Sequence, residues 1–158
     1  MASADIDRID RKIIAELQRD ARITNADLAN RVGLSESPCL RRVRRLEAAG
    51  FIKGYHAQID EVKLGVAFNI FVGIKVRRHA DDQTSAFETW AGQCAEIAAC
   101  YLVSGEIDYL LHVAVENISA YEEFLTSELL KNTSIKDIRS NIALRVVKSS
   151  FGVKAVFD

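Results

Sequence analysis

TNADLANRVGLSESPCLRRVRRLEAAGFI, residues 24–52, is the stretch of sequence that decides the fold of the N-terminal half. It predicts two short helices joined by a tight turn. Thr24 is expected to cap the first helix, and Gly33 to end it in the left-handed conformation that glycine adopts at low cost. Ser35 is expected to cap the second helix and Gly50 to end it. This punctuation is typical of a helix–turn–helix.

The second predicted helix carries four arginines within five positions, namely Arg41, Arg42, Arg44 and Arg45. At about 100° per residue, Leu40 and Leu46 lie within about 60° of Val43, and these three residues form the expected buried stripe. Arg41 and Arg45 lie about 160° from Val43, on the outward face. They are the candidates for contacting bases in the DNA major groove, because the planar guanidinium pairs bidentately with guanine.

Other residues of the same helix complete the predicted DNA-contacting surface. Arg42 and Arg44 flank the outward face, where a guanidinium can reach phosphate oxygens. Ser37 shares the outward face, and Ser35 and Pro38 lie at the start of the helix, where a proline is tolerated. A solvated basic helix on some other helical hairpin is the alternative, and the surrounding capping residues favour the DNA-binding interpretation.

The two halves of the chain differ in charge although the net charge is only −1. Residues 1–55 hold 11 Lys and Arg against 8 Asp and Glu, whereas residues 56–158 hold 10 against 14. Only the basic first half is therefore expected to face phosphates. No apolar run approaches the roughly 18 to 20 residues that span a bilayer. The charged first ten residues lack an apolar signal core, so a cytoplasmic protein is expected.

The reactive side chains show no metal-binding or catalytic pattern. Cys39, Cys94 and Cys100 are odd in number and lack C-x-x-C spacing, which argues against a disulfide framework and against a zinc site. Cys39 is expected to pack against the helix core. The sequence contains no G-x-S-x-G, H-E-x-x-H or Gly-rich phosphate loop. It therefore predicts no metal, no cofactor and no enzymatic activity, and it disfavours a metabolic enzyme subunit.

Apolar spacing extends the first domain on both sides of the helix–turn–helix. Apolar residues recur at three- and four-residue steps from Ile6 to Ala21, which predicts a preceding helix. Residues 51–59 alternate loosely around Gly54, which favours a short strand or a hairpin wing. The sequence therefore predicts a winged helix–turn–helix DNA-binding domain over residues 1–60.

The second half changes its apolar period and predicts one βαββαβ unit of the ferredoxin-like type over residues 66–158. Strands are expected near residues 66–76, 97–103, 108–115 and 138–146, with helices near 87–94 and 119–129. Ser119 and Glu122 are expected to form a capping box. Two helices can cover only one sheet face, so the opposite face, with Phe71 and Tyr101, predicts a homodimer closed sheet on sheet.

Three segments resemble the Lrp/AsnC family of bacterial and archaeal transcription regulators. They are DRIDRKIIAELQRDARIT (7–24), ANRVGLSESPCLRRVRRLEAAGFIKGY (29–55) and LVSGEIDYLL (102–111). Within the second segment, SPCLRRVRRLE followed by GFI is similar to the leucine-responsive branch. The resemblance implies a winged-type helix–turn–helix and a βαββαβ (RAM-type) domain that dimerises, gathers dimers into larger and often octameric rings, and senses small amino acids.

The resemblance also implies an effector pocket around the loop between the second and third strands of the sensor domain. The residues concerned are Val103, Ser104, Gly105, Glu106, Asp108 and Tyr109, with Asn132, Thr133 and Ser134 supplied by a neighbouring subunit. A glycine at the turn lets a ligand carboxylate approach backbone N–H groups, and Asp108 could pair with an α-ammonium. By spacing alone, Gly105 could equally be a hairpin glycine and Asp108 an acid at the start of a strand.

These expectations combine into one function. The chain is expected to be a sequence-specific regulator that binds double-stranded DNA as a dimer, with two recognition helices about one helical turn apart. An amino-acid effector is expected to change its oligomeric state or its DNA binding. An architectural DNA-wrapping protein that ignores effectors is the alternative.

Overall fold

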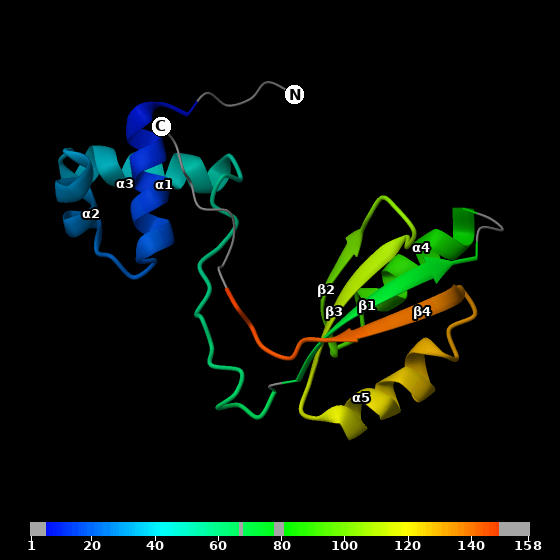
Figure 1. Ribbon diagram of the computed structural model, residues 1–158. Helices are drawn as coiled ribbons and strands as arrows, with labels where there is room; N and C mark the ends of the chain where they lie inside the picture. Colours follow the sequence, from blue (N-terminus) through cyan, green and yellow to red (C-terminus); the bar gives the residue numbers. More distant parts are fainter. Residues whose placement is uncertain (1–5, 67, 78–80, 149–158) are drawn as a thin grey trace. The chain divides into compact units, whose positions relative to one another are not determined.

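The computed structural model describes residues 6–66, 68–77 and 81–148 and divides into two compact units. Unit 1 contains the chain up to Gln58, and unit 2 runs from Ile59 to Lys148 (Figure 1). Each unit has its own hydrophobic core. The first five and the last ten residues of the two predicted domains lie outside the described residues.

Unit 1 is built from three helices, α1 (Arg8–Arg19), α2 (Asn25–Val32) and α3 (Glu36–Ala48). The predicted caps of α2 are confirmed: the Thr24 hydroxyl accepts a hydrogen bond from the Asp27 N–H at 3.1 Å, and Gly33 follows the helix at φ 76°. Ser35 occupies the N-cap position of α3, but its side chain makes no cap hydrogen bond. The capping residues predicted from the sequence, Thr24, Gly33 and Ser35, therefore occupy the ends of helices in the structure.

The core of unit 1 draws on all three helices. Its buried apolar residues are Ile13 from α1, Leu28, Ala29 and Val32 from α2, and Cys39 and Leu46 from α3. The expected packing of Cys39 against the helix core is confirmed, since it is 0% exposed. Asp10 of α1 is also 0% exposed. A buried carboxylate is costly unless it is paired, so this residue requires partners.

The strand or hairpin expected at Phe51–Ile59 is not formed in this structure, because residues 53–60 form neither helix nor strand. The start of the segment is held by α3 instead. The N–H groups of Phe51 and Ile52 donate to the Leu46 carbonyl oxygen at 2.9 and 3.3 Å, and the Tyr55 hydroxyl donates to a Glu47 carboxylate oxygen at 2.9 Å. A hairpin alone is marginally stable.

Unit 2 has the predicted order of strands and helices. The strands are β1 (Phe68–Val76), β2 (Ile97–Leu102), β3 (Tyr109–Val115) and β4 (Ile135–Ile142), and the helices are α4 (Asp81–Ala91) and α5 (Ile118–Phe124), which continues as the π-helical turn η1 (Leu125–Leu129). The sheet order is β2-β3-β1-β4, and all neighbouring strands are antiparallel. The ferredoxin-like topology is therefore confirmed.

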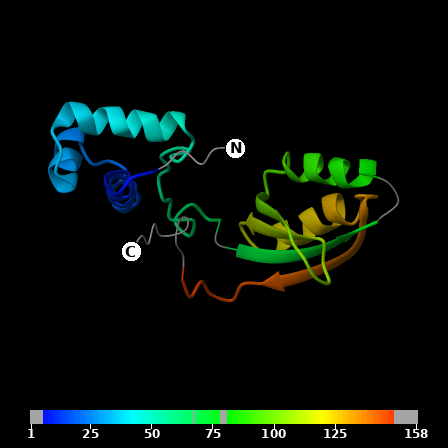
Figure 2. The same cartoon turned by 90° about the horizontal axis from the view of Figure 1, so that it is seen from above.

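The helices α4 and α5 cover the same face of the sheet (Figure 2). The sheet contributes Ile70, Val72, Ile74, Leu111 and Val113 to the core beneath them. Phe87 from α4 is fully buried in this core, with its ring centroid 4.7 Å from that of Tyr109 and 5.5 Å from that of Trp90. Trp90 is only partly buried but packs against the core.

The opposite face of the sheet carries exposed aromatic side chains. Phe71 is 40% exposed and Tyr101 is 57% exposed. The Phe71 ring stacks on the His112 ring of the neighbouring strand, with centroids 5.0 Å apart. Gly73 lies on β1, as Phe71 does. A Cβ at Gly73 would lie 3.1 Å from the Ile107 side chain, so the glycine makes room for Ile107. This face combines the two aromatic side chains with polar ones such as His112 and Asn141, which pair with Phe71, and it has no covering layer among the described residues.

Two details of unit 2 differ from the sequence predictions. The N-cap of α5 is Asn117 rather than Ser119, because the Asn117 side chain already accepts the Ala120 N–H at 3.0 Å and Ser119 lies inside the helix. The last strand ends at Ile142, so the predicted continuation to residue 146 is wrong. Its partner β1 begins at Phe68, which leaves the chain beyond residue 143 without a neighbouring strand.

Candidate nucleic-acid interface and effector loop

The recognition helix α3 is turned relative to the predicted orientation. Leu40, expected in the buried stripe, is 39% exposed, whereas Cys39 and Leu46 are 0% and 1% exposed and Val43 is partly buried. The prediction for Leu40 is therefore wrong. The physical reason is that Arg42, which helical spacing alone places at the edge of the core, is partly buried as well, because acids on α1 neutralise it.

Arg42 and Arg45 both form ion pairs with α1. One guanidinium nitrogen of Arg42 lies 2.6 Å from an Asp7 carboxylate oxygen and 2.9 Å from an Asp10 oxygen. Arg45 pairs with the other Asp10 oxygen. The Arg42 side chain is 27% exposed and the Arg45 side chain 55% exposed. Two of the four arginines predicted to contact DNA are thus engaged within unit 1.

The two acids also cap α1. The Asp7 carboxylate accepts the N–H groups of Ile9 and Asp10, both at 2.8 Å, and the Asp10 carboxylate accepts the Asp7 N–H at 3.1 Å. The N–H of Asp10 and the guanidinium of Arg42 lower the pKa of Asp7 from 3.8 to about 2. Asp7 and Arg42 in turn hold one another charged, since Asp7 raises the pKa of Arg42.

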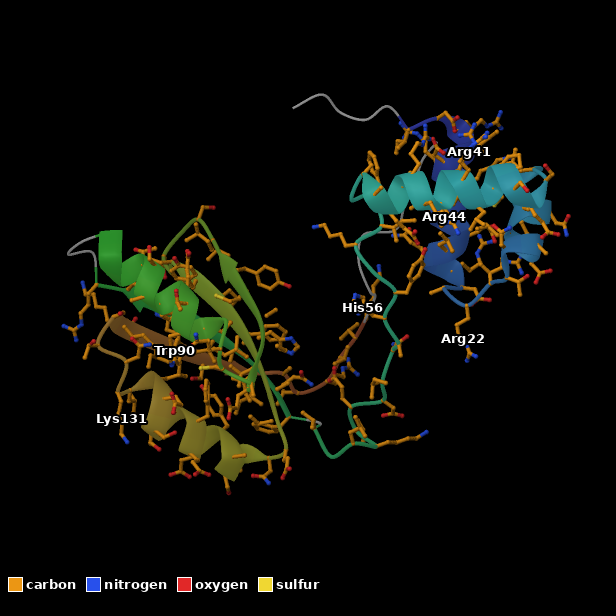
Figure 3. All side chains as sticks on the ribbon, turned by 180° about the vertical axis from the view of Figure 1, so that it is seen from behind. Arg22, Arg41, Arg44, His56, Trp90 and Lys131 are labelled. Carbon is orange, nitrogen blue, oxygen red and sulfur yellow. The ribbon has the colours of Figure 1, made fainter. Side chains whose placement is uncertain are left out.

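Arg41 and Arg44 form the outward face of α3. They lie about 160° and 140° around the helix from the buried Cys39. Both are exposed, and neither pairs with an acid among the described residues. Ser37 lies on the same face and is also exposed. Figure 3 shows Arg41 and Arg44 on α3 with the other side chains of unit 1 around them.

The first turn of α3 carries the remaining predicted contacts. Ser35 is exposed and Pro38 partly buried. Because Ser35 does not cap the helix, the N–H groups of Glu36 and Ser37 donate to no described residue. Asn25 of α2 fixes this end by donating to the Glu36 carbonyl oxygen at 3.0 Å. Open N–H groups at a helix N-terminus are suited to binding an anion such as a phosphate.

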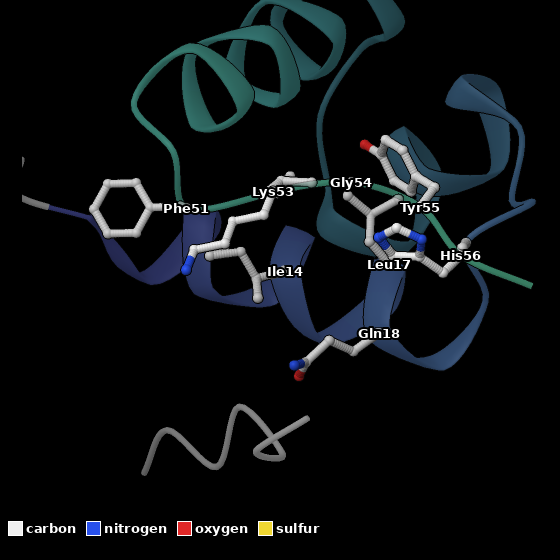
Figure 4. A pocket seen from close by; sticks show the side chains of 10 residues that line it. Ile14, Leu17, Gln18, Phe51, Lys53, Gly54, Tyr55 and His56 are labelled. Atoms are coloured by element: carbon white, nitrogen blue, oxygen red, sulfur yellow. The ribbon is translucent and has the colours of Figure 1, made fainter. Parts of the chain in front are cut away.

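A hollow of about 280 Å³ lies between α1 and residues 51–56 (Figure 4). Its apolar lining comes from Ile14 and Leu17 of α1 together with Phe51, and Lys53 is also part of the wall. The hollow contains none of the residues predicted to bind DNA or an effector. No group of three or more His, Cys, Asp or Glu suited to a metal ion occurs in the described part of the chain.

The predicted effector loop forms the turn between β2 and β3. The Val103 N–H donates to the Asp108 carbonyl oxygen at 2.9 Å and closes the loop. Gly105 has φ 127°, a backbone conformation that residues with a side chain rarely adopt, so this position requires glycine. The N–H groups of residues 104–107 donate to no described residue. The exposed Glu106 pairs with Arg139 of β4 at 2.7 Å.

Asp108 and Tyr109 are engaged inside unit 2. An Asp108 carboxylate oxygen accepts the Val76 N–H at 2.9 Å, next to the irregularity in the pairing of β1 with β4. Tyr109 is buried, and its hydroxyl donates to Glu88 at 2.7 Å. Burial and the Glu88 carboxylate together raise the pKa of Tyr109 well above its usual value. Asp108 therefore anchors the loop to the end of β1.

The other predicted effector residues lie at the same end of this sheet. The Ser134 carbonyl oxygen accepts the N–H of Arg77, the residue after Val76, at 2.9 Å. Ser134 is buried, and its own N–H donates to the Asn132 side chain at 3.0 Å, whereas Thr133 is exposed. One chain therefore brings residues 103–109 and 132–134 to one sheet end, although the resemblance assigned the second set to a neighbouring subunit.

The sequence reasoning missed Asp7 and Asp10 as partners of the recognition helix. A signal was present. Asp10 lies three residues before Ile13 and seven before Leu17, which places it on the apolar stripe of α1. An acid on a buried stripe requires a cation opposite, and α3 offers several arginines.

Comparison with known proteins identifies both units. Residues 6–53 match the model of a winged helix-turn-helix DNA-binding family, and residues 69–153 match the Lrp/AsnC ligand binding domain. Unit 1 is thus a DNA-binding module and unit 2 a ligand-binding module, which together define a ligand-responsive class of transcription regulator. The chain belongs to the Lrp/AsnC family of transcription regulators.

The similarity extends along nearly the whole chain. The chain is 46% identical over 146 residues to the leucine-responsive regulatory protein of Escherichia coli K12, covering 92% of this chain and 89% of that protein. A transcriptional regulator of Neisseria meningitidis, solved in complex with L-methionine, superposes with a TM-score of 0.90 at 32% identity and covers 94% of this chain and 96% of its own. E. coli AsnC superposes with a TM-score of 0.85 at 26% identity, and the match covers 95% of this chain and 99% of that one. No described helix is long and apolar enough to cross a membrane.

Proposed function

We propose that Arg41 and Arg44, with Ser37, form the surface of α3 that reads DNA bases, while the open N–H groups at the start of α3 bind a phosphate. The exposure of both arginines, and their lack of an acidic partner among the described residues, supports this assignment. Helical spacing alone placed Arg45 with Arg41 as a base contact and Arg42 on the flank as a phosphate contact. Arg42 and Arg45 are engaged by Asp7 and Asp10, and we assign both a secondary role.

Replacing the outward arginines tests this surface. A duplex selected from a random pool by the wild-type protein serves as the specific site. We expect Arg41→Ala and Arg44→Ala each to weaken binding to this duplex by about 5- to 150-fold, the range of roughly 1–3 kcal/mol that a bidentate base contact contributes. Lys63→Ala, which removes an exposed cation outside unit 1, is the control. Unchanged affinity of both arginine variants at matched salt would contradict the assignment.

We propose further that unit 2 senses an amino acid at the loop of residues 103–108. The N–H groups of residues 104–107 are available for an α-carboxylate, and Gly105 leaves the approach open, with nothing within 4 Å of an added Cβ. Asp108 and Glu106 supply negative charge for an α-ammonium. The N. meningitidis relative was solved with L-methionine, which favours this ligand class.

The effector proposal is tested by calorimetry of the whole protein against the twenty amino acids. Asp108→Asn keeps an oxygen that can accept the Val76 N–H but removes the charge, so we expect at least about tenfold weaker binding of the amino acid that binds. Asp137→Asn, an exposed acid of β4, is the control. Binding of no amino acid would favour the architectural, effector-independent function instead.

We propose that the uncovered sheet face closes a homodimer, and that dimers assemble further into rings such as an octamer. The exposed Phe71 and Tyr101 support the dimer, since burying aromatic surface is a main driving force of association. Beyond β4, Leu144 and Val147 are 96% and 85% exposed and offer apolar surface for contacts between dimers.

A further inference from the structure

Asp10 is the one charged side chain among the described residues of unit 1 that is buried in its core, and the proposed DNA contacts do not use it. We propose that Asp10 determines specificity: it holds Arg45, and with Asp7 also Arg42, against α1, and thereby limits the phosphate contacts that α3 can make with DNA of any sequence. The inference rests on the proposed DNA-binding role of α3 and assigns a function to a residue that touches no DNA.

Both oxygens of the Asp10 carboxylate accept hydrogen bonds. One oxygen accepts from Arg42 at 2.9 Å, and the other accepts from Arg45 and from the Asp7 N–H. Asp10 is 0% exposed. An ion that is removed from water in this way is stable only while its partners remain, and losing one partner is strongly destabilising. At least one arginine of α3 must therefore stay with Asp10 while unit 1 is folded.

The two arginines are held unequally. Arg42 has two acidic partners and a side chain that is 27% exposed, whereas Arg45 has one acidic partner and is 55% exposed. A phosphate could draw Arg45 away only by leaving Asp10 with a single cation. The cost opposes binding to every phosphate alike. Contacts by Arg41 and Arg44 carry no such cost, because neither has an acidic partner among the described residues.

The consequence is a smaller electrostatic contribution to non-specific binding. Affinity for DNA of any sequence depends on the number of phosphates neutralised, and each adds about one to the slope of log affinity against log salt. The helix carries four arginines, but Asp7 and Asp10 offset two of these charges. The base-reading arginines then account for a larger share of the total affinity, which raises the ratio of specific to non-specific binding.

The test is Asp10→Asn, which preserves the shape of the side chain but removes the negative charge that holds Arg42 and Arg45. We expect the full-length variant to bind a random-sequence duplex several-fold more tightly at low salt, with a salt slope steeper by roughly one. Its ratio of specific to non-specific affinity should fall. Glu16→Gln is the matched control, because Glu16 also pairs with two arginines, Arg19 and Arg31, neither of which lies on α3.

The outcomes separate the inference from simpler explanations. A merely structural role for Asp10 predicts weaker binding to all DNA, and it can never predict tighter non-specific binding. Lower affinity for both duplexes, or an unchanged salt slope in a folded Asp10→Asn protein, would therefore overturn the proposal. An equal gain in the Glu16→Gln control would also overturn it, since the gain would then reflect net charge alone.

A second comparison does not depend on the folding of the Asp10 variant. On the random-sequence duplex, where no specific base contact is made, Arg45→Gln should lower the salt slope by much less than Arg41→Gln. Arg45 is held by Asp10, whereas Arg41 has no acidic partner among the described residues and can contact phosphates. Equal changes of about one in both variants would refute the role of Asp10 but leave α3 as the DNA-binding helix. No change with Arg41→Gln, Arg44→Gln or Arg45→Gln would instead refute the proposed function of α3.

Discussion

Asp7 and Asp10 connect the start of α1 to the middle of α3 through side chains alone. Asp7 has an extended backbone conformation and accepts two helix N–H groups, so its charge is fixed at the positive end of the α1 dipole. The same carboxylate receives Arg42 at 2.6 Å. Asp10, which is buried, likewise accepts a backbone N–H at the start of α1 and pairs with Arg42 and Arg45 of α3. Four charged side chains thus form one network that sets which arginines of α3 remain available.

The network makes a prediction about acid. The pKa of Asp7 is lowered to about 2, first by the Asp10 N–H and then by Arg42. A lowered pKa means that the folded state binds the proton more weakly than the unfolded state, so the stabilisation is complete above the ordinary value of 3.8 and is lost as the pH falls through about 2.

We therefore expect the wild-type protein to unfold at higher urea concentration than Asp7→Asn at pH 5, when followed by helical circular dichroism. The two midpoints should converge as the pH falls from about 4 to 2. A difference between the midpoints that stays constant over this interval would show that the Asp7 charge contributes nothing.

At the scale of elements, α3 shows how the orientation of a helix depends on charge pairs as well as on apolar spacing. Cys39 and Leu46 are buried, and Leu40 is 39% exposed. Arg42 can be partly buried because its ion pair with Asp10 offsets the cost of removing its charge from water. The turn of the helix brings Arg44 onto the outward face and Arg45 towards α1.

This orientation predicts unequal effects of two similar substitutions. Leu46→Ala should lower the free energy of unfolding by about 2–5 kcal/mol, because it leaves a cavity in the core. Leu40→Ala removes a side chain of the same size from a partly exposed position and should cost about 0.5 kcal/mol or less. Urea unfolding followed by helical circular dichroism measures both. Comparable losses would mean that the predicted stripe of Leu40, Val43 and Leu46 is the buried one after all.

Most elements could be predicted from the sequence because their signals are local. Helix ends at Thr24 and Gly33, and the alternation of β1, depend on residues close in sequence. The orientation of α3 could not be predicted in this way, because it depends on Asp10, which is 32 residues from Arg42. The prediction of a strand around Gly54 was wrong for a similar reason: a strand needs a partner strand, and the local sequence does not reveal whether one is present.

At the scale of the whole molecule, each unit has its own core, and none of the residues that the structure describes covers the second sheet face of unit 2. Phe71, stacked on His112, lies on that face. The loop proposed to bind the effector lies at one end of the same sheet, where Asp108 holds the end of β1. A ligand at this loop could therefore alter the sheet that is proposed to pair with a second copy, provided that it binds one assembly state more tightly than another.

The proposed dimer predicts the effect of a charge on the open face. Phe71→Glu should shift the mass measured by light scattering from the assembled form towards the monomer, because an unpaired carboxylate would be buried in the interface. Ile118→Glu is the control, since Ile118 is 53% exposed but begins α5, away from that face. An unchanged mass for Phe71→Glu would exclude this face as the dimer interface.

The coupling of the two units is tested most directly by the DNA affinity of the full-length protein with and without its amino acid. Fluorescence anisotropy on the selected duplex at fixed salt provides the measurement, with the amino acid identified by calorimetry. We expect a change in affinity of at least about fivefold at saturating ligand, as is typical of coupled sites, and we expect Asp108→Asn to require a much higher ligand concentration for the same change. An amino acid that binds unit 2 and leaves both the DNA affinity and the assembled mass unchanged would contradict the account.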